Sequence, residues 1–217
     1  MKKKLYEDAT RVLLETDRED EILLKLKDDI IDYRGTVKGN AKNKASVNAA
    51  IAVHLFKLLY AYHVPTCFKS QKSAKELVLK KADAFPFKIV VVNDSDKNAP
   101  NIEYLSIDES LETKVSEKKL VSDSLVDEEQ LSDIRRIVLK INVLLKDFFD
   151  RRGIECLGFS IQLGMINDNL GVCSELCLDT CDVKEKHSRV KFTSTYMSSH
   201  LESAVELYDQ ALNMILY

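Results

Sequence analysis

The sequence predicts an α+β protein of two lobes, a small antiparallel lobe over about residues 1–93 and a larger mixed lobe over 94–217. Three observations indicate this fold class. Short strand-like segments dominate the first part of the chain, a long amphipathic helix begins near residue 128, and two alternating apolar segments follow it. A chain of 217 residues is long enough to bury a substantial core in one large lobe or two smaller ones.

The small lobe is predicted to begin as a meander of short strands. Apolar residues recur at Tyr6, at Val12–Leu14 and at Ile22–Leu26, as expected of strands. The polar residues Asp17–Asp20 interrupt the pattern between the second and third of these segments. We therefore expect three consecutive strands joined by short turns.

One helix and two further strands are expected to complete the small lobe. The helix is predicted over Ser46–Tyr62, and strands are predicted over Val78–Ala82 and Phe87–Val92, with Pro86 fitting a strand start. The apolar residues of the helix fall on one stripe and should face the strands. They are Val47, Ile51, Leu55, Leu58 and Tyr62.

The larger lobe is predicted to start with a polar connection and a long helix. Residues 94–127 show no strong helix pattern. Apolar residues at helical spacing predict a helix over Glu128–Arg151, and Gly153 is a typical C-terminal stop. A last helix is expected after Ser199–Glu202, a sequence typical of a capping box.

Between these helices the sequence predicts a β-hairpin, residues 156–177. Apolar residues alternate over Leu157–Gly164 and again over Val172–Cys181, with Asn167–Asn169 and Gly171 as turn residues between them. One face of this hairpin should be buried, and the other should look into a cleft.

Composition excludes several classes of protein. A net charge of −3 without a basic stripe argues against nucleic-acid binding. No apolar run approaches the roughly 20 residues that cross a bilayer, and no apolar leader follows the N-terminal lysines. We expect a cytoplasmic protein whose five cysteines are reduced thiols.

The hairpin resembles the paired strands of SAICAR synthetases, in which V-D-F-K-L-E-F-G is followed by L-A-D-E-x-S-P-D-T-C-R. The likeness runs nearly end to end: Lys3–Glu7 is similar to K-L-Y-E, Lys27–Ile30 to F-K-D-D-I, Val64–Thr66 to I-P-T, and Leu77–Lys81 to M-L-V-K-K. This resemblance implies a SAICAR synthetase-like, ATP-grasp/kinase-like fold whose small lobe holds the nucleotide. It also implies ATP and Mg²⁺ as cofactors.

Several residues that the family uses are replaced in this chain. By the resemblance, the two magnesium-holding acids fall on Gln162 and Ser174, and a lysine falls on Ser160. Two arginines that would contact the substrate fall on Val92 and Asp182. The phosphate-binding loop, G-K-A-K in the family, is Asp8–Arg11 here. Binding of Mg²⁺-ATP is therefore expected to be weak or absent.

The residues that remain are candidates for a residual site, and none is assigned a catalytic role. Arg11, Lys80 and Lys81 are the candidates for nucleotide binding, although Arg11 also fits a solvated strand residue. Lys44 and Asn48 share one helical face near a helix start and, with Asp179, are candidates for the substrate side; an ordinary helix start explains the first two equally well. Glu175 is the candidate metal ligand.

Other clusters favour a structural interpretation. Cys173, Cys177 and Cys181 recur at equal spacing, but zinc sites typically use closer pairs. The four histidines lack the neighbours that nucleophilic catalysis needs.

Two hypotheses about function follow from the resemblance. The first is a SAICAR synthetase-like protein with lost or strongly reduced ligase activity, acting as a binding or regulatory module for a nucleotide or ribotide. The alternative is an active enzyme that joins aspartate to carboxyaminoimidazole ribotide with ATP. The number of replaced charges favours the first hypothesis, and the sequence leaves open whether the chain forms a homo-oligomer.

Overall fold

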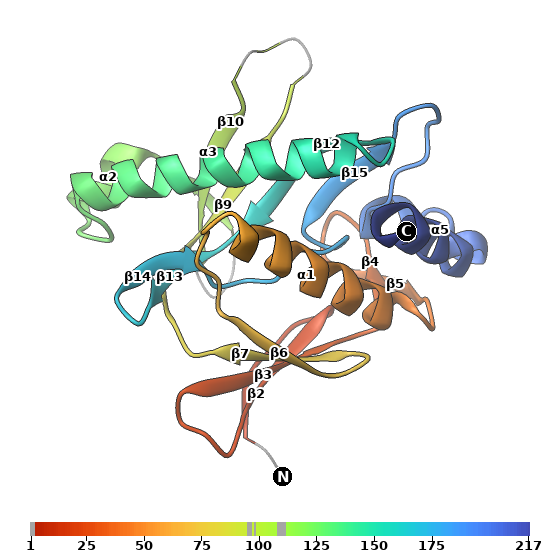
Figure 1. Cartoon of the computed structure of the whole chain (residues 1–217), viewed down its shortest axis with the longest axis horizontal. Helices are drawn as coiled ribbons and strands as arrows, with labels where there is room; N and C mark the ends of the chain where they lie inside the picture. The colour runs from red at the N-terminus through yellow and green to blue at the C-terminus, as the bar shows by residue number, and fades with distance from the viewer. Residues whose placement is uncertain (1–2, 95–96, 98, 108–111) are drawn as a thin grey trace.

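A computed structural model describes residues 3–94, 97, 99–107 and 112–217. Two five-stranded sheets form the body of the molecule, and helix α1 (Lys44–Ala61) lies between them (Figure 1). The predicted α+β class is confirmed.

The first sheet has the strand order β1-β2-β3-β7-β6, and its neighbouring strands are antiparallel. The predicted meander and the strand near residue 78 are confirmed. Strand β6 was missed because its sequence, FKSQKS, is polar and mostly exposed. The bounds are β1 Lys4–Glu7, β2 Arg11–Glu15, β3 Glu21–Leu26, β6 Phe68–Ser73 and β7 Glu76–Lys80.

The second sheet has the order β11-β10-β9-β12-β15, with antiparallel neighbours. Its middle strand is β9, which we expected in the small sheet; β9 pairs instead with β10 and β12, so its place in the small sheet is corrected. Phe87, Ile89 and Val91 bury one face of β9. The bounds are β9 Phe87–Val92, β10 Asn101–Ser106, β11 Thr113–Val115, β12 Ile154–Ile161 and β15 Cys181–Glu185.

Helix α1 packs on both sides, which the single predicted stripe did not anticipate. The stripe of Val47, Ile51 and Leu55 belongs to the core under the second sheet. The opposite side belongs to a second core under the first sheet, formed with Leu24, Leu77 and Leu79, and the helix contributes Ala45, Ala49, Ala52 and Phe56 to it. Small alanine side chains on this side allow the helix to lie close to the first sheet.

The hairpin in this region is shorter than predicted, and its turn lies at the predicted residues. Strands β13 (Leu163–Ile166) and β14 (Asn169–Val172) form it, and the turn residues Asn167 and Asp168 have φ of 47° and 62°, as a type I′ turn requires. Strand β13 also pairs with β8 (Asp83–Ala84). Residues 173–180 lie outside any strand, so the expectation that Val172–Cys181 forms the second strand is wrong.

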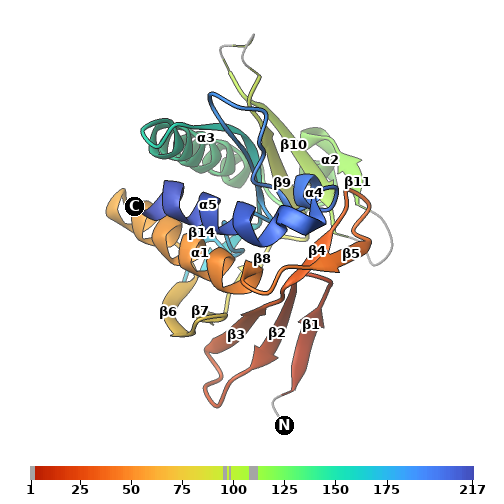
Figure 2. The ribbon, with the colours of Figure 1, turned by 90° about the vertical axis from the view of Figure 1, so that its right-hand side faces the viewer.

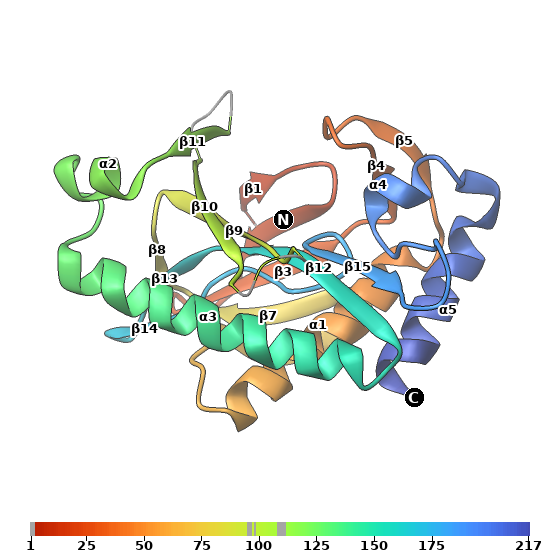
Figure 3. The same cartoon turned by 90° about the horizontal axis from the view of Figure 1, so that it is seen from above.

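The long helix α3 (Glu128–Asp150) confirms the prediction and crosses the second sheet near β12, on the side that also carries α1 (Figure 3). Its N-terminus carries the capping box, because Asp127 accepts from the backbone of Gln130 while the Gln130 side chain accepts from Asp127. Gly153 ends the segment with φ of 70°, a conformation that glycine adopts without strain. The short helix α2 (Glu117–Ser122) precedes α3 in the segment that we expected to be irregular.

At the C-terminus, α4 (Ser194–Met197) and a 3₁₀ turn (Leu201–Ser203) lead into α5 (Ala204–Leu216). The capping box predicted at Ser199–Glu202 is wrong, because the N-cap of α5 is Ser203 and its side chain makes no capping bond. Figure 2 shows α4 beside the two-stranded sheet of β4 (Asp29–Ile31) and β5 (Val37–Asn40). In the described ranges, every helix is too short or too polar to cross a bilayer.

Candidate functional site

Two adjoining pockets lie beside the second sheet, and only the smaller one also reaches the first sheet. The smaller, of about 230 Å³, is lined by the β1–β2 turn and by residues 160–162, 174–175 and 179–180; we call it the turn pocket. The larger, of about 690 Å³, is lined by β9, β12 and the segment that contains α4; we call it the wide pocket. The two pockets share five lining residues, so they are parts of one cleft: Ile31, Lys88, Ser160, Asp179 and Thr180.

The β1–β2 turn is closed by its own carboxylate. Asp8 Oδ1 accepts hydrogen bonds from the backbone N–H of Thr10 at 2.7 Å and of Arg11 at 2.9 Å, and from the Thr10 hydroxyl at 2.8 Å. Burial opposes ionisation of Asp8, but these hydrogen bonds and the charge of Arg11 hold its pKa below the ordinary value. The N–H groups of Thr10 and Arg11 are therefore already engaged by an anion from within the chain.

Arg11 is engaged in the same way by an acid from the far end of the sequence. Its Nη1 donates to both carboxylate oxygens of Glu175, at 2.6 and 2.5 Å. The Arg11 side chain is 25% exposed and that of Glu175 only 5%. The charge of Glu175 is the main cause that raises the pKa of Arg11 above its ordinary value. The predicted nucleotide-binding cation and the predicted metal ligand thus neutralise each other.

The positions of the two missing acids lie together in the turn pocket, as the resemblance predicts, but their side chains serve the local fold. The backbone N–H of Gln162 donates to Ser174 Oγ at 2.9 Å, and Gln162 Nε2 donates to the carbonyl of Phe85 at 2.8 Å. Among the described residues, no group of three His, Cys, Asp or Glu side chains is placed to hold a metal ion. Gln162 and Ser174 offer only neutral oxygens, and the acids of the pocket are already engaged: Asp8 by the turn, Glu112 by Lys88, Glu175 by Arg11 and Asp179 by Lys44. These residues therefore do not fit Mg²⁺.

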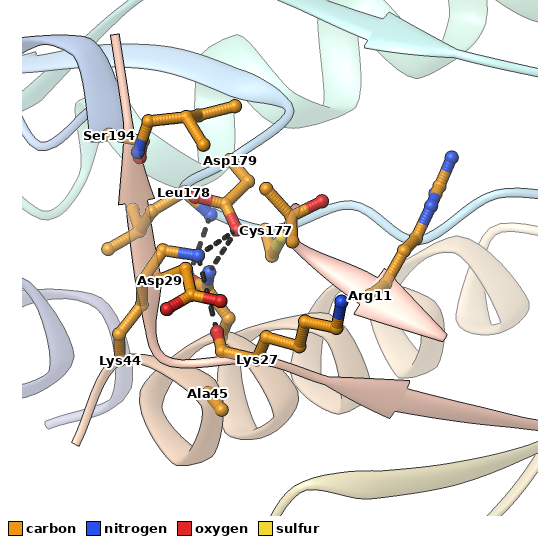
Figure 4. Close-up of polar contacts among 12 residues, drawn as sticks. Arg11, Lys27, Asp29, Lys44, Ala45, Cys177, Leu178, Asp179 and Ser194 are labelled. Carbon is orange, nitrogen blue, oxygen red and sulfur yellow. Dashed lines mark hydrogen bonds and ion pairs between the residues drawn. The ribbon is translucent and has the colours of Figure 1, made fainter. Parts of the chain in front are cut away.

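Lys44, Asn48 and Asp179 meet behind the cleft. Asp179 Oδ2 accepts from Lys44 Nζ at 2.5 Å and from Asn48 Nδ2 at 2.9 Å, as Figure 4 shows for the ion pair. The Lys44 side chain is fully buried and that of Asp179 is 7% exposed. Lys44 and Asn48 line neither pocket, so they position Asp179, the member of the group that reaches the cleft.

The second oxygen of Asp179 has no hydrogen-bond partner although it is buried. Burial raises the pKa of the Asp179 carboxyl, while the charge of Lys44 opposes this rise. Asp179 lines both pockets, so an unpartnered acceptor lies at their junction.

Lys80 and Lys81 are both exposed at the end of β7, and they line neither pocket. Their backbone N–H groups donate to Cys67 and to Asp20. Their assignment as nucleotide-binding residues remains a prediction.

The wide pocket contains the positions at which the resemblance places substrate-binding charges. Val92 and Asp182 lie in its wall, and Asp182 faces Lys191 at 3.8 Å. Gly158 approaches β9 so closely that a Cβ there would lie 2.3 Å from the carbonyl oxygen of Val91. An aspartate, which the family pattern has at this position, would require the backbone of β12 or β9 to move.

Sequence reasoning missed the segment that closes the wide pocket. Thr193, Ser194 and Tyr196 line it, and the Ser194 hydroxyl accepts from the backbone N–H of Ile31 at 3.1 Å. The signal for this wall in the sequence is the dense run of hydroxyl residues over 193–199.

All five cysteines are free. Burial raises the pKa of Cys156 and of Cys173 to about 12. Glu175 lies in the irregular segment 173–180 and not on the strand predicted over Val172–Cys181.

Comparison with known proteins places this cleft in a family. A family model for SAICAR synthetase matches residues 4–99 and 98–215 of the chain. The chain belongs to the SAICAR synthetase family. It is 29% identical over 226 residues to a phosphoribosylaminoimidazole-succinocarboxamide synthase of Clostridium botulinum, with 97% of each chain covered. A synthase of the same name from Campylobacter jejuni is 27% identical over 232 residues, which cover 99% of this chain and 98% of that one.

Solved structures agree on the fold. The phosphoribosylaminoimidazole-succinocarboxamide synthase of Ehrlichia chaffeensis superimposes with a TM-score of 0.90 at 22% identity, covering 98% of both chains. A SAICAR synthetase solved in complex with ADP gives a TM-score of 0.89 at 22% identity, covering 99% of this chain and 97% of that one. The predicted two-lobed SAICAR synthetase fold is thereby confirmed.

Proposed function

We propose that this member of the SAICAR synthetase family has lost, or retains only a trace of, ATP-dependent ligase activity and uses its cleft to bind a small molecule. One observation carries the proposal: the charged groups of the turn pocket are satisfied by one another. Asp8 binds the N–H groups of the β1–β2 turn, and Arg11 binds Glu175 through both carboxylate oxygens.

A triphosphate entering the turn pocket would have to displace these contacts. The Asp8 carboxylate would then lie beside phosphate oxygens, and a pair of like charges at about 4 Å costs on the order of 1 to 4 kcal/mol, depending on screening. Arg11 would have to leave Glu175, which would remain buried without a partner. Transfer of a phosphoryl group relies on cations to stabilise developing charge, and this pocket offers no free one among its described residues.

The wide pocket supports the same conclusion. With Val92 and Asp182 at positions where the family pattern has arginines, a phosphorylated ribotide lacks charge-assisted partners. Each hydrogen bond to a charged group contributes roughly 1.5 to 3 kcal/mol, so the loss of two is a large fraction of a binding free energy.

The test combines turnover with nucleotide titration. Purified protein is incubated with carboxyaminoimidazole ribotide, aspartate, ATP and Mg²⁺, and ATP binding is titrated calorimetrically with and without Mg²⁺. We expect no SAICAR and a weak ATP affinity that Mg²⁺ does not raise. Turnover on the order of 1 per second would show that the chain is an active synthetase. A micromolar affinity that depends on Mg²⁺ would contradict the argument that the turn pocket no longer accepts the nucleotide.

A restored variant makes this test sharper. Asp8→Gly, Gln162→Glu and Ser174→Asp together remove the internal anion and supply two acids, and we expect Mg²⁺-ATP binding to strengthen by at least about tenfold. The matched control, Ser70→Asp with Gln71→Glu, adds the same two acids to exposed positions on β6 outside both pockets. The control should leave the affinity unchanged.

A further inference from the structure

Hydroxyl groups dominate the polar surface of the wide pocket. Seven lining side chains carry one: Ser160, Thr180, Thr193, Ser194, Thr195, Tyr196 and Ser199. Thr180, Thr193 and Ser194 use their hydroxyls to hold nearby backbone N–H groups. In the described part of the chain, the remaining four hydroxyls have no protein partner and can bond to a ligand.

The charges of this pocket cancel. Lys88 donates to Glu112 at 2.6 Å, and Lys191 faces Asp182 at 3.8 Å. Asp179, at the junction with the turn pocket, is paired with the buried Lys44. Each cation in the wall therefore has its own carboxylate, and no cation is left over for a phosphate among the described residues.

Two more observations indicate the shape and polarity of a ligand. The buried, unpartnered oxygen of Asp179 is an acceptor for a donor group such as a hydroxyl. The other walls are apolar, with Val92, Leu157, Phe159 and Leu178 among the lining residues, which suits a flat, weakly polar ring. A volume of about 690 Å³ lies within the range of small-molecule sites.

We propose that the wide pocket binds an uncharged, polyhydroxylated molecule of nucleoside size and disfavours its 5′-phosphate. The free hydroxyls and Asp179 would bond to the sugar, and the apolar wall would contact the ring. A phosphate would be repelled by Asp182. Lys88 and Lys191 could bind it only by breaking an existing ion pair. This inference rests on the proposed function, because a working ligase must bind a ribotide here.

The test is a set of calorimetric titrations in physiological salt without divalent cations. The probes are adenosine, inosine and uridine, each compared with its own 5′-monophosphate. We expect at least one nucleoside to bind about tenfold or more tightly than its monophosphate. Tighter binding of every monophosphate, equal binding within each pair, or no nucleoside binding up to millimolar concentration would overturn the proposal.

Two variants, each with a matched control, test whether nucleosides bind in the wide pocket. Asp182→Asn releases Lys191 and should raise monophosphate affinity, whereas Asp168→Asn makes the same charge change in the exposed β13–β14 turn and should not. Ser199→Trp should fill the pocket and abolish nucleoside binding, whereas Ser188→Trp, at an exposed position outside it, should not. Nucleoside binding that survives Ser199→Trp would contradict this location.

The outcomes separate the two proposals. SAICAR production by the same preparation would refute the proposed function directly. Equal affinity for nucleosides and monophosphates without SAICAR production would overturn only the ligand class.

Discussion

Two ion pairs of the cleft, Lys44–Asp179 and Arg11–Glu175, join the same two parts of the sequence but differ in burial and in their position relative to the cleft. Each joins a cation from the first fifty residues to an acid of the segment 173–180. Lys44 is fully buried and lies behind the cleft, whereas Arg11 is 25% exposed and lines the turn pocket. The first pair therefore holds the fold together at the cleft floor, while the second also determines what the cleft can bind.

The largest effect is expected from Lys44→Met. The Asp179 carboxylate would remain buried without its charge partner, and breaking a buried pair in this way costs about 3–5 kcal/mol of the free energy of unfolding. Urea unfolding measures this loss. Lys42→Met, at an exposed position two residues earlier, is the control and should change stability by less than about 0.5 kcal/mol.

The pH dependence of the Lys44→Met variant distinguishes charge from packing. Without Lys44, the pKa of Asp179 should rise further, because burial and the charges of Glu175 and Asp8 raise it and the cation that opposes them is gone. A carboxyl whose folded pKa lies above the unfolded value contributes stability at low pH and loses it as pH rises through the folded pKa. The variant should therefore recover stability relative to the wild type as pH falls from 7 towards 5, and a constant difference would indicate lost packing instead.

A smaller effect is expected from Arg11→Met. Glu175 would lose both of its hydrogen bonds from Arg11, but the site is partly open to water, so we expect a loss of about 1.5–3 kcal/mol in urea unfolding. Arg18→Met removes an arginine that is 64% exposed in its own ion pairs and should cost less than about 1 kcal/mol. Equal losses for the two variants would mean that Arg11–Glu175 behaves as an ordinary surface pair.

The smallest effect on stability is expected from Asp8→Ala, about 1 kcal/mol, since the turn loses an acceptor for three hydrogen bonds that water can partly replace. The same change frees the N–H groups of Thr10 and Arg11, so inorganic tripolyphosphate should bind more tightly than to the wild type. Titration calorimetry measures this gain. Asp17→Ala, at an exposed position in the next turn, should leave tripolyphosphate binding unchanged.

Local patterns predicted the elements whose neighbours are close in sequence. The long helix α3 and its glycine stop follow from spacing and backbone freedom within a few residues. The place of β9 does not follow in this way, because its partner β12 lies more than sixty residues away and an apolar strand suits either sheet. Strand β10 is mostly only half-buried and carries polar residues, so its alternation is weak.

The residues of the site also divide into those that the sequence could identify and contacts that only the folded chain shows. Resemblance directed attention to Arg11, Glu175 and Asp179, and all three line the cleft. That Arg11 binds Glu175, 164 residues away, is a property of the folded chain that no local pattern records. Likewise, Lys44 and Asn48 fall near a predicted helix start, but only the packing of α1 against the segment 173–180 shows that they face Asp179 from inside the protein.

Helix α1 is shared by both hydrophobic cores, and this limits how the cleft can open. Moving one sheet away from the other as a rigid body would strip apolar contacts from one side of α1, so the sheets are mechanically linked through it. Admission of a ligand is then left to local displacement of the outer segments around the wide pocket, such as the hydroxyl-rich stretch 193–199. We therefore expect the two sheets to keep a constant separation when a ligand enters, and the rim of the cleft to determine access.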